Sequence, residues 1–202
     1  MFSRHDLVWL TPAAWDAAPA MSQWRERDWP AVVRRHEAGV APGAVCLGIP
    51  LPARQRVALL VGAADIARTA PPLPLTDAIA AAPPQWLAGL VALQRATAAL
   101  DLRVYGSLAM ASITGLPYLR AASDIDLLLR PADRHALDAG LALLEEHANV
   151  LPLDGEIVFP SGDAVAWKEW LAACRGHARV LVKSLHAVRL ADPAQLLATL
   201  PR

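Results

Sequence analysis

The stretch Val104–Asp126 constrains the fold more tightly than any other part of this sequence. A short β-like run over Leu102–Tyr105 ends at Gly106 and Ser107, and a helix-compatible segment follows. The stretch closes on an Asp-Ile-Asp triplet, which leads into the apolar run Leu127–Leu129. This order predicts two neighbouring strands, with a tight turn after the first and a pair of carboxylates at the start of the second.

Asp124 and Asp126 are candidate metal ligands. Side chains two residues apart on a strand point to the same side of a sheet, so both should project together while Ile125 faces the core. Two such carboxylates offer the hard oxygen ligands that Mg²⁺ takes, with water and substrate phosphates completing its shell. An Asp-x-Asp pair and a Gly-Ser pair are each common at strand ends and turns. Their combination in this order is what predicts a phosphate-binding and metal-binding site.

Other residues are candidates for the same chemistry. A third carboxylate would complete a two-metal site, and both Asp154 and Glu156 qualify because they share a face if their segment is extended. Ser107 and the backbone N–H groups around Gly106 would hold departing phosphates, although a helix N-cap is an equally good role for Ser107. Lys183 follows a short apolar run, where it would contact a triphosphate or remain a solvated surface charge.

The sequence lacks the motifs of two common enzyme classes. It contains no G-x-S-x-G nucleophile elbow, which a Ser-His-Asp hydrolase of that type would need, and no Walker-type phosphate loop. Cys46 and Cys174 are far apart and lack metal-ligand spacing, which predicts buried or free thiols.

The composition argues against nucleic-acid and membrane partners. Acidic and basic residues balance at 19 each, so no global positive field favours nucleic acid. The long uncharged stretches 78–94 and 104–119 contain Pro or Gly and fall short of the roughly 20 apolar residues that a membrane span needs. Charged residues near the N-terminus differ from the apolar core of a signal peptide, which favours a cytoplasmic protein.

Two domains are expected. Residues 1–75 carry short elements separated by Pro and Gly, and residues 84–202 carry longer helical and β-like segments. Proline clusters between Thr69 and Pro84 favour a linker at this point, because proline is stiff and interrupts regular structure.

The pattern of apolar residues and turn residues predicts several elements within these domains. They are a strand over Leu7–Leu10, a hairpin of Val45–Ile49 with Val57–Val61, a helix over Gln85–Leu100, and a helix over Ala132–Ala148 with Pro131 in its first turn. Four tryptophans, at positions 9, 15, 24 and 29, lie in the first domain. They are most simply bulk for a small core, and the alternative is an aromatic, arginine-lined surface for a nucleotide-like ligand.

A family resemblance joins these motifs. Gly106-Ser107 followed by Ser123-Asp124-Ile125-Asp126-Leu127 resembles the signature of the polymerase-β-like nucleotidyltransferase superfamily. More narrowly, the chain resembles the phosphoribosyl-dephospho-CoA transferases, the holo-acyl-carrier-protein synthases of malonate decarboxylase. The stretches that carry this narrower resemblance are Val104–Ala109, Thr114–Leu119, the Asp pair, Arg4–Trp9 and Asp154–Glu156. Together they span nearly the whole chain.

The resemblance implies an α+β fold, with a small N-terminal mixed domain and a C-terminal polymerase-β-like nucleotidyltransferase domain whose mixed sheet is flanked by helices. It implies a metal-dependent transferase that uses Mg²⁺. The implied reaction moves phosphoribosyl-dephospho-CoA from 2′-(5″-triphosphoribosyl)-3′-dephospho-CoA to a serine of an apo acyl carrier protein, the malonate decarboxylase δ subunit, and releases pyrophosphate. The N-terminal domain would then bind the dephospho-CoA portion or the carrier protein.

Two alternatives stand beside this reading. A nucleotidyltransferase that uses an ordinary NTP on a protein or small molecule would keep the chemistry and change the substrate. A non-catalytic partner-binding module would have no need for a like-charged pair such as Asp124 and Asp126, because their mutual repulsion disfavours ionisation in the absence of a cation.

Overall fold

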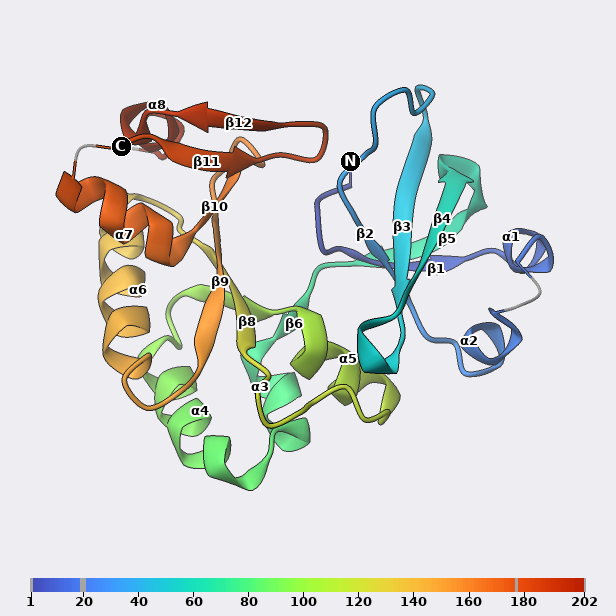
Figure 1. Ribbon diagram of the computed structural model, residues 1–202, viewed down its shortest axis with the longest axis horizontal. Helices are drawn as coiled ribbons and strands as arrows, with labels where there is room; N and C mark the ends of the chain where they lie inside the picture. The colour runs from blue at the N-terminus through green and yellow to red at the C-terminus, as the bar shows by residue number, and fades with distance from the viewer. Residues whose placement is uncertain (1, 19–20, 177, 202) are drawn as a thin grey trace. The chain divides into compact units, whose positions relative to one another are not determined.

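The chain folds into two compact units that each combine helices with a sheet. A computed structural model describes residues 2–18, 21–176 and 178–201. The first unit comprises Met1–Pro72 with Leu185–Ala187, and the second comprises Leu73–Ser184 with Val188–Arg202. The fold is therefore of the predicted α+β class (Figure 1). Across the described residues, no helix combines the length and the apolar character that crossing a membrane requires.

Within the described residues, the first unit holds a five-stranded antiparallel sheet with the strand order β4-β3-β2-β1-β5. Its elements are β1 (Leu7–Leu10), α1 (Pro12–Asp16), α2 (Ser22–Glu26), β2 (Ala31–Val33), β3 (Ala44–Pro50), β4 (Arg56–Gly62) and β5 (Ile66–Ala70). The predicted first strand is β1 and the predicted hairpin is β3 with β4, so both are confirmed.

The tryptophans of the first unit divide between core and surface. Trp15 and Trp24 are 7% and 3% exposed, which confirms the core interpretation for these two. The indole N–H of Trp24 donates to the carbonyl of Pro30 at 2.9 Å, so its polar atom is satisfied inside the core. Trp9 is partly buried, and its ring centroid lies 3.8 Å from the guanidinium of Arg68, which also pairs with Asp28.

The described part of the second unit holds a seven-stranded mixed sheet with the order β12-β11-β10-β9-β8-β7-β6. Its strands are β6 (Leu73–Pro74), β7 (Asp101–Val104), β8 (Ile125–Arg130), β9 (Leu153–Val158), β10 (Ala164–Ala166), β11 (Val180–Lys183) and β12 (Val188–Ala191). Its helices are α3 (Leu75–Ala78), α4 (Pro84–Ala96), α5 (Gly106–Thr114), α6 (Arg134–His147), α7 (Trp167–Gly176) and α8 (Pro193–Leu197). Strands β8 and β9 pair in parallel, and the other neighbouring strands pair antiparallel.

One face of β8 lies in the core of this unit. Ile125, Leu127 and Leu129 share a hydrophobic cluster with residues of α4 and α6, two helices that contact each other. Both helices place apolar residues three and four positions apart, which gives each of them one apolar face for this core. The residues of β8 that alternate with these three, starting with Asp126, therefore lie on the opposite face of the sheet.

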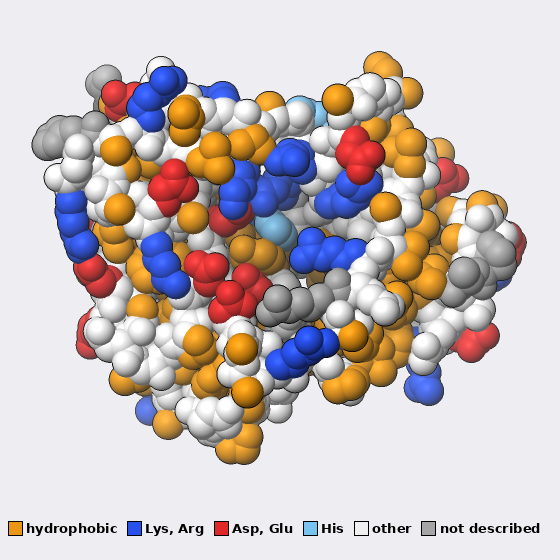
Figure 2. Space-filling model, viewed as in Figure 1, with side chains coloured by type: hydrophobic (Ala, Val, Ile, Leu, Met, Phe, Trp, Pro, Cys, Tyr) orange, Lys and Arg blue, Asp and Glu red, His pale blue; other side chains and the backbone are white. Residues whose placement is uncertain are grey.

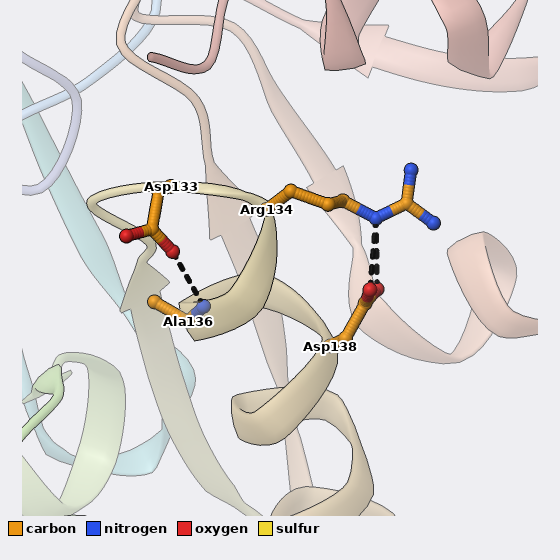
Figure 3. Close-up of polar contacts among 4 residues, drawn as sticks. All are labelled: Asp133, Arg134, Ala136 and Asp138. Carbon is orange, nitrogen blue, oxygen red and sulfur yellow. Dashed lines mark hydrogen bonds and ion pairs between the residues drawn. The ribbon is translucent and has the colours of Figure 1, made fainter. Parts of the chain in front are cut away.

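Helix α6 begins at a side-chain cap. A carboxylate oxygen of Asp133 accepts a hydrogen bond from the backbone N–H of Ala136 at 2.8 Å (Figure 3). Aspartate is among the preferred N-cap residues because it satisfies an N–H group that has no partner within the helix. The prediction that Pro131 lies in the first turn is wrong, since the helix begins three residues later, at Arg134.

The segment between the two predicted domains has regular structure. Its residues form β6, α3 and a 3₁₀ helix over Ile79–Ala81, all within the second unit, with Leu75 and Ala78 buried in the core. The strand β12 was not predicted from the sequence. Its apolar residues Val188 and Leu190 are 42% and 54% exposed, and Ala191 is its one buried residue.

We expect Asp133→Ala to lower the free energy of unfolding by about 1 kcal/mol, the usual cost of removing an N-cap side chain. Urea denaturation monitored by circular dichroism measures it. The matched control is Asp138→Ala on the same helix, which removes an ion pair to Arg134 in which both side chains are more than half exposed. That change should cost no more than about 0.5 kcal/mol. Equal costs for the two variants would contradict the capping role.

Candidate functional site

The parallel pairing of β8 with β9 positions the polar residues of both strands. Asp126 pairs in register with Asp154, and Leu128 pairs with Glu156. Ile125 has no exposed surface, as predicted, so Asp126 projects from the face that the main core does not use. Parallel strands start at the same end of a sheet, which brings the first residues of β8 and β9 together although α6 separates them in the chain.

Asp124, Asp126 and Asp154 form a group of acidic side chains, which we call the carboxylate cluster. Each offers one oxygen, and these oxygens all lie within 4.8 Å of one another. Asp124 is exposed, and the other two are partly buried. In Figure 2, acidic side chains gather on the surface over β8 and β9. The donor chemistry of three carboxylate oxygens at this separation suits a divalent cation.

Glu156 lies outside the carboxylate cluster. It is 4% exposed, and its Oε1 accepts a hydrogen bond from Nζ of Lys183 at 2.9 Å. The sequence left Asp154 and Glu156 as equal candidates for the third carboxylate. In the structure, Asp154 lies with Asp124 and Asp126. Glu156 instead forms an ion pair with Lys183, the residue predicted from the sequence to contact a triphosphate.

Gly106 allows helix α5 to begin directly against the carboxylate cluster. Its φ is +67°, and a Cβ added there would overlap Oδ2 of Asp126. The backbone N–H of Tyr105 donates to the carbonyl of Asp126 at 3.0 Å, which fixes the turn next to β8. Ser107 is half-buried and is the second residue of α5, two positions beyond the N-cap residue Tyr105, so the N-cap role considered for Ser107 is wrong. The carboxylate of Asp126 therefore packs directly against the backbone of Gly106 at the start of α5.

Gly155 has a different structural role between Asp154 and Glu156. Its φ is +131°, and a Cβ there would overlap the backbone of Leu127 on the paired strand. Glycine is therefore required for β9 to approach β8 with this register. Since that register brings Asp154 to Asp126, Gly155 supports the carboxylate cluster without offering a side chain.

Lys168 lies beside the carboxylate cluster and was not predicted from the sequence. It is the second residue of α7, and its Nζ lies 3.6 Å from Oδ1 of Asp154. The register Ala166↔Glu156, continued by two residues, would bring Lys168 opposite Asp154. A strand at Ala164–Ala166 paired with β9 would have predicted this position of Lys168. The sequence of Ala164–Ala173 is compatible with either a strand or a helix, so the pairing could not be predicted.

Both halves of the chain match families of one kind. Residues 3–72 match the phosphoribosyl-dephospho-CoA transferase MdcG N-terminal domain. Residues 74–194 match the phosphoribosyl-dephospho-CoA transferase MdcG C-terminal domain. The second match contains the carboxylate cluster, Gly106, Lys168 and the Glu156–Lys183 pair.

Curated relatives match over nearly their full length. A phosphoribosyl-dephospho-CoA transferase of Xanthomonas campestris pv. campestris (strain 8004) is 42% identical over 206 residues, with 94% of each chain covered. The relative of the same name from Bradyrhizobium diazoefficiens is 37% identical over 96% of this chain and 92% of its own. That of Klebsiella pneumoniae (strain 342) is 34% identical over 92% of both. No solved structure is a significant match to the chain.

Gly106→Ala should weaken the binding of a divalent cation by tenfold or more, because the new methyl group displaces the carboxylate of Asp126. Manganese titration followed by electron paramagnetic resonance measures this affinity. The matched control is Gly115→Ala at the other end of α5, where φ is +70° and no atom lies within 4 Å of the added Cβ. Both variants carry similar backbone strain, roughly 1 kcal/mol. Equal manganese affinities would contradict the contact with Asp126.

Lys183→Met should lower the free energy of unfolding by about 1–3 kcal/mol, because it removes a hydrogen-bonded cation from a buried carboxylate. Urea denaturation measures the change. Lys168→Met is the control: that lysine is 55% exposed and its ion pair is longer, so its loss should cost less than about 0.5 kcal/mol. A smaller cost at Lys183 than at Lys168 would show that the Glu156–Lys183 pair does not stabilise the fold.

Proposed function

The chain belongs to the phosphoribosyl-dephospho-CoA transferase family, and on that premise we propose the specific reaction that it catalyses. It transfers phosphoribosyl-dephospho-CoA from 2′-(5″-triphosphoribosyl)-3′-dephospho-CoA to a serine of an apo acyl carrier protein, the δ subunit of malonate decarboxylase, in the cytoplasm. The serine oxygen attacks the phosphorus nearest the ribose and forms a phosphodiester. The bond from that phosphorus to the bridging oxygen breaks, pyrophosphate leaves, and the serine proton passes to solvent.

The observation that carries the proposal is the meeting of Asp124, Asp126 and Asp154 within a chain whose two halves both match this family. Transfer of a phosphoryl-type group depends mostly on charge neutralisation and on the alignment of the attacking and leaving oxygens. Three carboxylates on one surface have the chemistry to organise cations for this purpose, and one of them, Asp126, lies against the first residue of α5.

We propose that the carboxylate cluster holds Mg²⁺ through Asp124 and Asp126, with Asp154 as the third catalytic carboxylate. When bound, the cation polarises the phosphorus centre and lowers the pKa of the attacking hydroxyl. The donor set fits this ion, since magnesium prefers carboxylate oxygens and keeps positions for water and substrate phosphates. Glu156 serves this site indirectly, by fixing β9 and β11 through Lys183.

Gly106 and Ser107 bind the substrate phosphates in this proposal. The backbone N–H groups of the first turn of α5, which have no acceptor within a helix, donate to phosphate oxygens in this proposal. The hydroxyl of Ser107 donates a further hydrogen bond. These contacts orient the triphosphate so that its leaving group points away from the incoming serine.

The two parts of the chain have separate tasks. Residues 84–202 form the catalytic domain, for which we propose the polymerase-β-like nucleotidyltransferase fold, since a mixed sheet carries the carboxylates at the start of β8 and β9 beside a Gly-Ser helix start. Residues 1–75 form a domain that binds the dephospho-CoA portion or the carrier protein. The stacking of Arg68 on Trp9 supports a role in ligand or partner recognition, because both side chains suit a flat or anionic group.

Intact-mass analysis of the carrier protein tests the reaction. Purified apo carrier is incubated with this protein, Mg²⁺ and the triphosphoribosyl substrate, and parallel reactions contain ATP, GTP, CTP or UTP in its place. We expect a mass gain of one phosphoribosyl-dephospho-CoA group that requires Mg²⁺ and disappears with EDTA. A nucleotide-sized gain would assign an NTP as the substrate. No gain from a folded protein and a competent carrier would favour the binding-module alternative.

Asp124→Asn and Asp126→Asn should each lower the transfer rate by at least a hundredfold, because each removes a charged cation ligand while keeping the side-chain shape. The rate of carrier modification measures the effect. Asp138→Asn on α6 is the control, since that carboxylate is exposed and pairs with Arg134. Near wild-type rates in either cluster variant would contradict the metal assignment.

A further inference from the structure

We infer that Lys168 binds the leaving pyrophosphate of the triphosphate substrate, an assignment that rests on the proposed function and names a residue for one of its steps. The sequence offered Lys183 for this contact. The two lysines differ in their acidic partners, in the distance from Nζ to the partner oxygen, and in the exposure of their side chains.

Lys183 is committed to the fold. Its Nζ lies 2.9 Å from an oxygen of Glu156, whose side chain is 5% exposed. Moving this ammonium to a substrate would break a hydrogen-bonded ion pair with a buried carboxylate, which is costly in a medium of low dielectric constant. Lys183 therefore stays with Glu156 during the reaction.

Lys168 is held loosely and lies at the reaction site. Its Nζ is 3.6 Å from Asp154, beyond normal hydrogen-bond length, and the side chains are 55% and 45% exposed. An ion pair of this kind contributes little to stability, so the ammonium can exchange partners at small cost. The ring of Trp167 lies 5.5 Å from the same Nζ and keeps the ammonium near the carboxylate cluster through a weak cation–π attraction.

The charge of the site provides a reason for this exchange. The carboxylate cluster carries three negative charges when ionised, and one divalent cation leaves one of them uncompensated. A bound triphosphate adds several more, and negative charge grows on the leaving oxygens as the bond to phosphorus breaks. Lys168 supplies a positive charge next to Asp154, on the helix α7 that follows β10. It donates hydrogen bonds to pyrophosphate oxygens.

Binding of inorganic pyrophosphate to the full-length protein tests the inference in the absence of carrier and CoA derivative. The dissociation constants of pyrophosphate, at saturating Mg²⁺, and of Mg²⁺ alone are measured by isothermal titration calorimetry for wild type, Lys168→Ala and Lys168→Arg. Arg175→Ala is the matched control, because it removes another exposed cation of α7 that pairs with Glu145 on α6. Steady-state kinetics with the triphosphoribosyl substrate accompany the binding data.

We expect Lys168→Ala to weaken pyrophosphate about tenfold or more, the range of a charge-assisted hydrogen bond, with its Mg²⁺ affinity equal to or slightly above that of wild type. Lys168→Arg should recover most of the loss, and Arg175→Ala should bind as wild type. Pyrophosphate affinity within twofold of wild type in Lys168→Ala would overturn the inference. So would a parallel loss of Mg²⁺ affinity, because it would mean that Lys168 only orients Asp154.

The binding data also separate this inference from the proposed reaction. Lysine-dependent pyrophosphate binding in a protein that fails to modify the carrier would support Lys168 and reject the proposed substrate or acceptor. Normal carrier modification, together with a pyrophosphate affinity that does not change in Lys168→Ala, would support the proposed reaction and reject the role of Lys168.

Discussion

The parallel register between β8 and β9 is the constraint on which the site depends. It pairs Asp126 with Asp154, so residues that are 28 positions apart in the numbering offer oxygens to one place. Gly155 makes this register possible, because a side chain there would overlap the backbone of Leu127. The same pairing places Ile125, Leu127 and Leu129 in the core, and their burial disfavours a one-residue slip that would exchange the two faces of the strand. Packing of the core and assembly of the site are thus two consequences of one alignment.

The neighbouring strands extend this alignment to the lysines. β10 pairs antiparallel with β9, and β11 pairs antiparallel with β10. As a result, Lys168 at the start of α7 lies near Asp154, and Lys183 on β11 lies against Glu156. Two acidic residues on one face of β9 consequently have different environments. Asp154 is partly exposed, lies beside Asp124 and Asp126, and is 3.6 Å from the exposed Lys168. Glu156 is buried, and its Oε1 lies 2.9 Å from Nζ of Lys183. This difference in burial is why we propose Asp154, and not Glu156, as the third catalytic carboxylate.

Much of the local structure was predictable from the sequence. The Asp pair, the buried Ile125 between its members and the helix after Gly106 follow from short-range periodicity, and the β3–β4 hairpin follows from two apolar runs around a turn. The choice between Asp154 and Glu156 was not predictable, because alternation defines a face but gives no distance along it. Lys168 and the pairing of Lys183 depend on register between strands that are distant in sequence. Such register is fixed by packing of the whole sheet and not by any local pattern.

We propose that Asp124, Asp126 and Asp154 bind one cationic centre. Anomalous diffraction from crystals of the protein grown with Mn²⁺, a substitute for Mg²⁺ with a strong anomalous signal, tests it most directly. We expect an anomalous peak at about 2–2.5 Å from a carboxylate oxygen of Asp124 and of Asp126, with Asp154 bound to the same ion or to a neighbouring one. A well-ordered crystal at saturating Mn²⁺ with no peak at these carboxylates, or with its peak elsewhere on the chain, would contradict it.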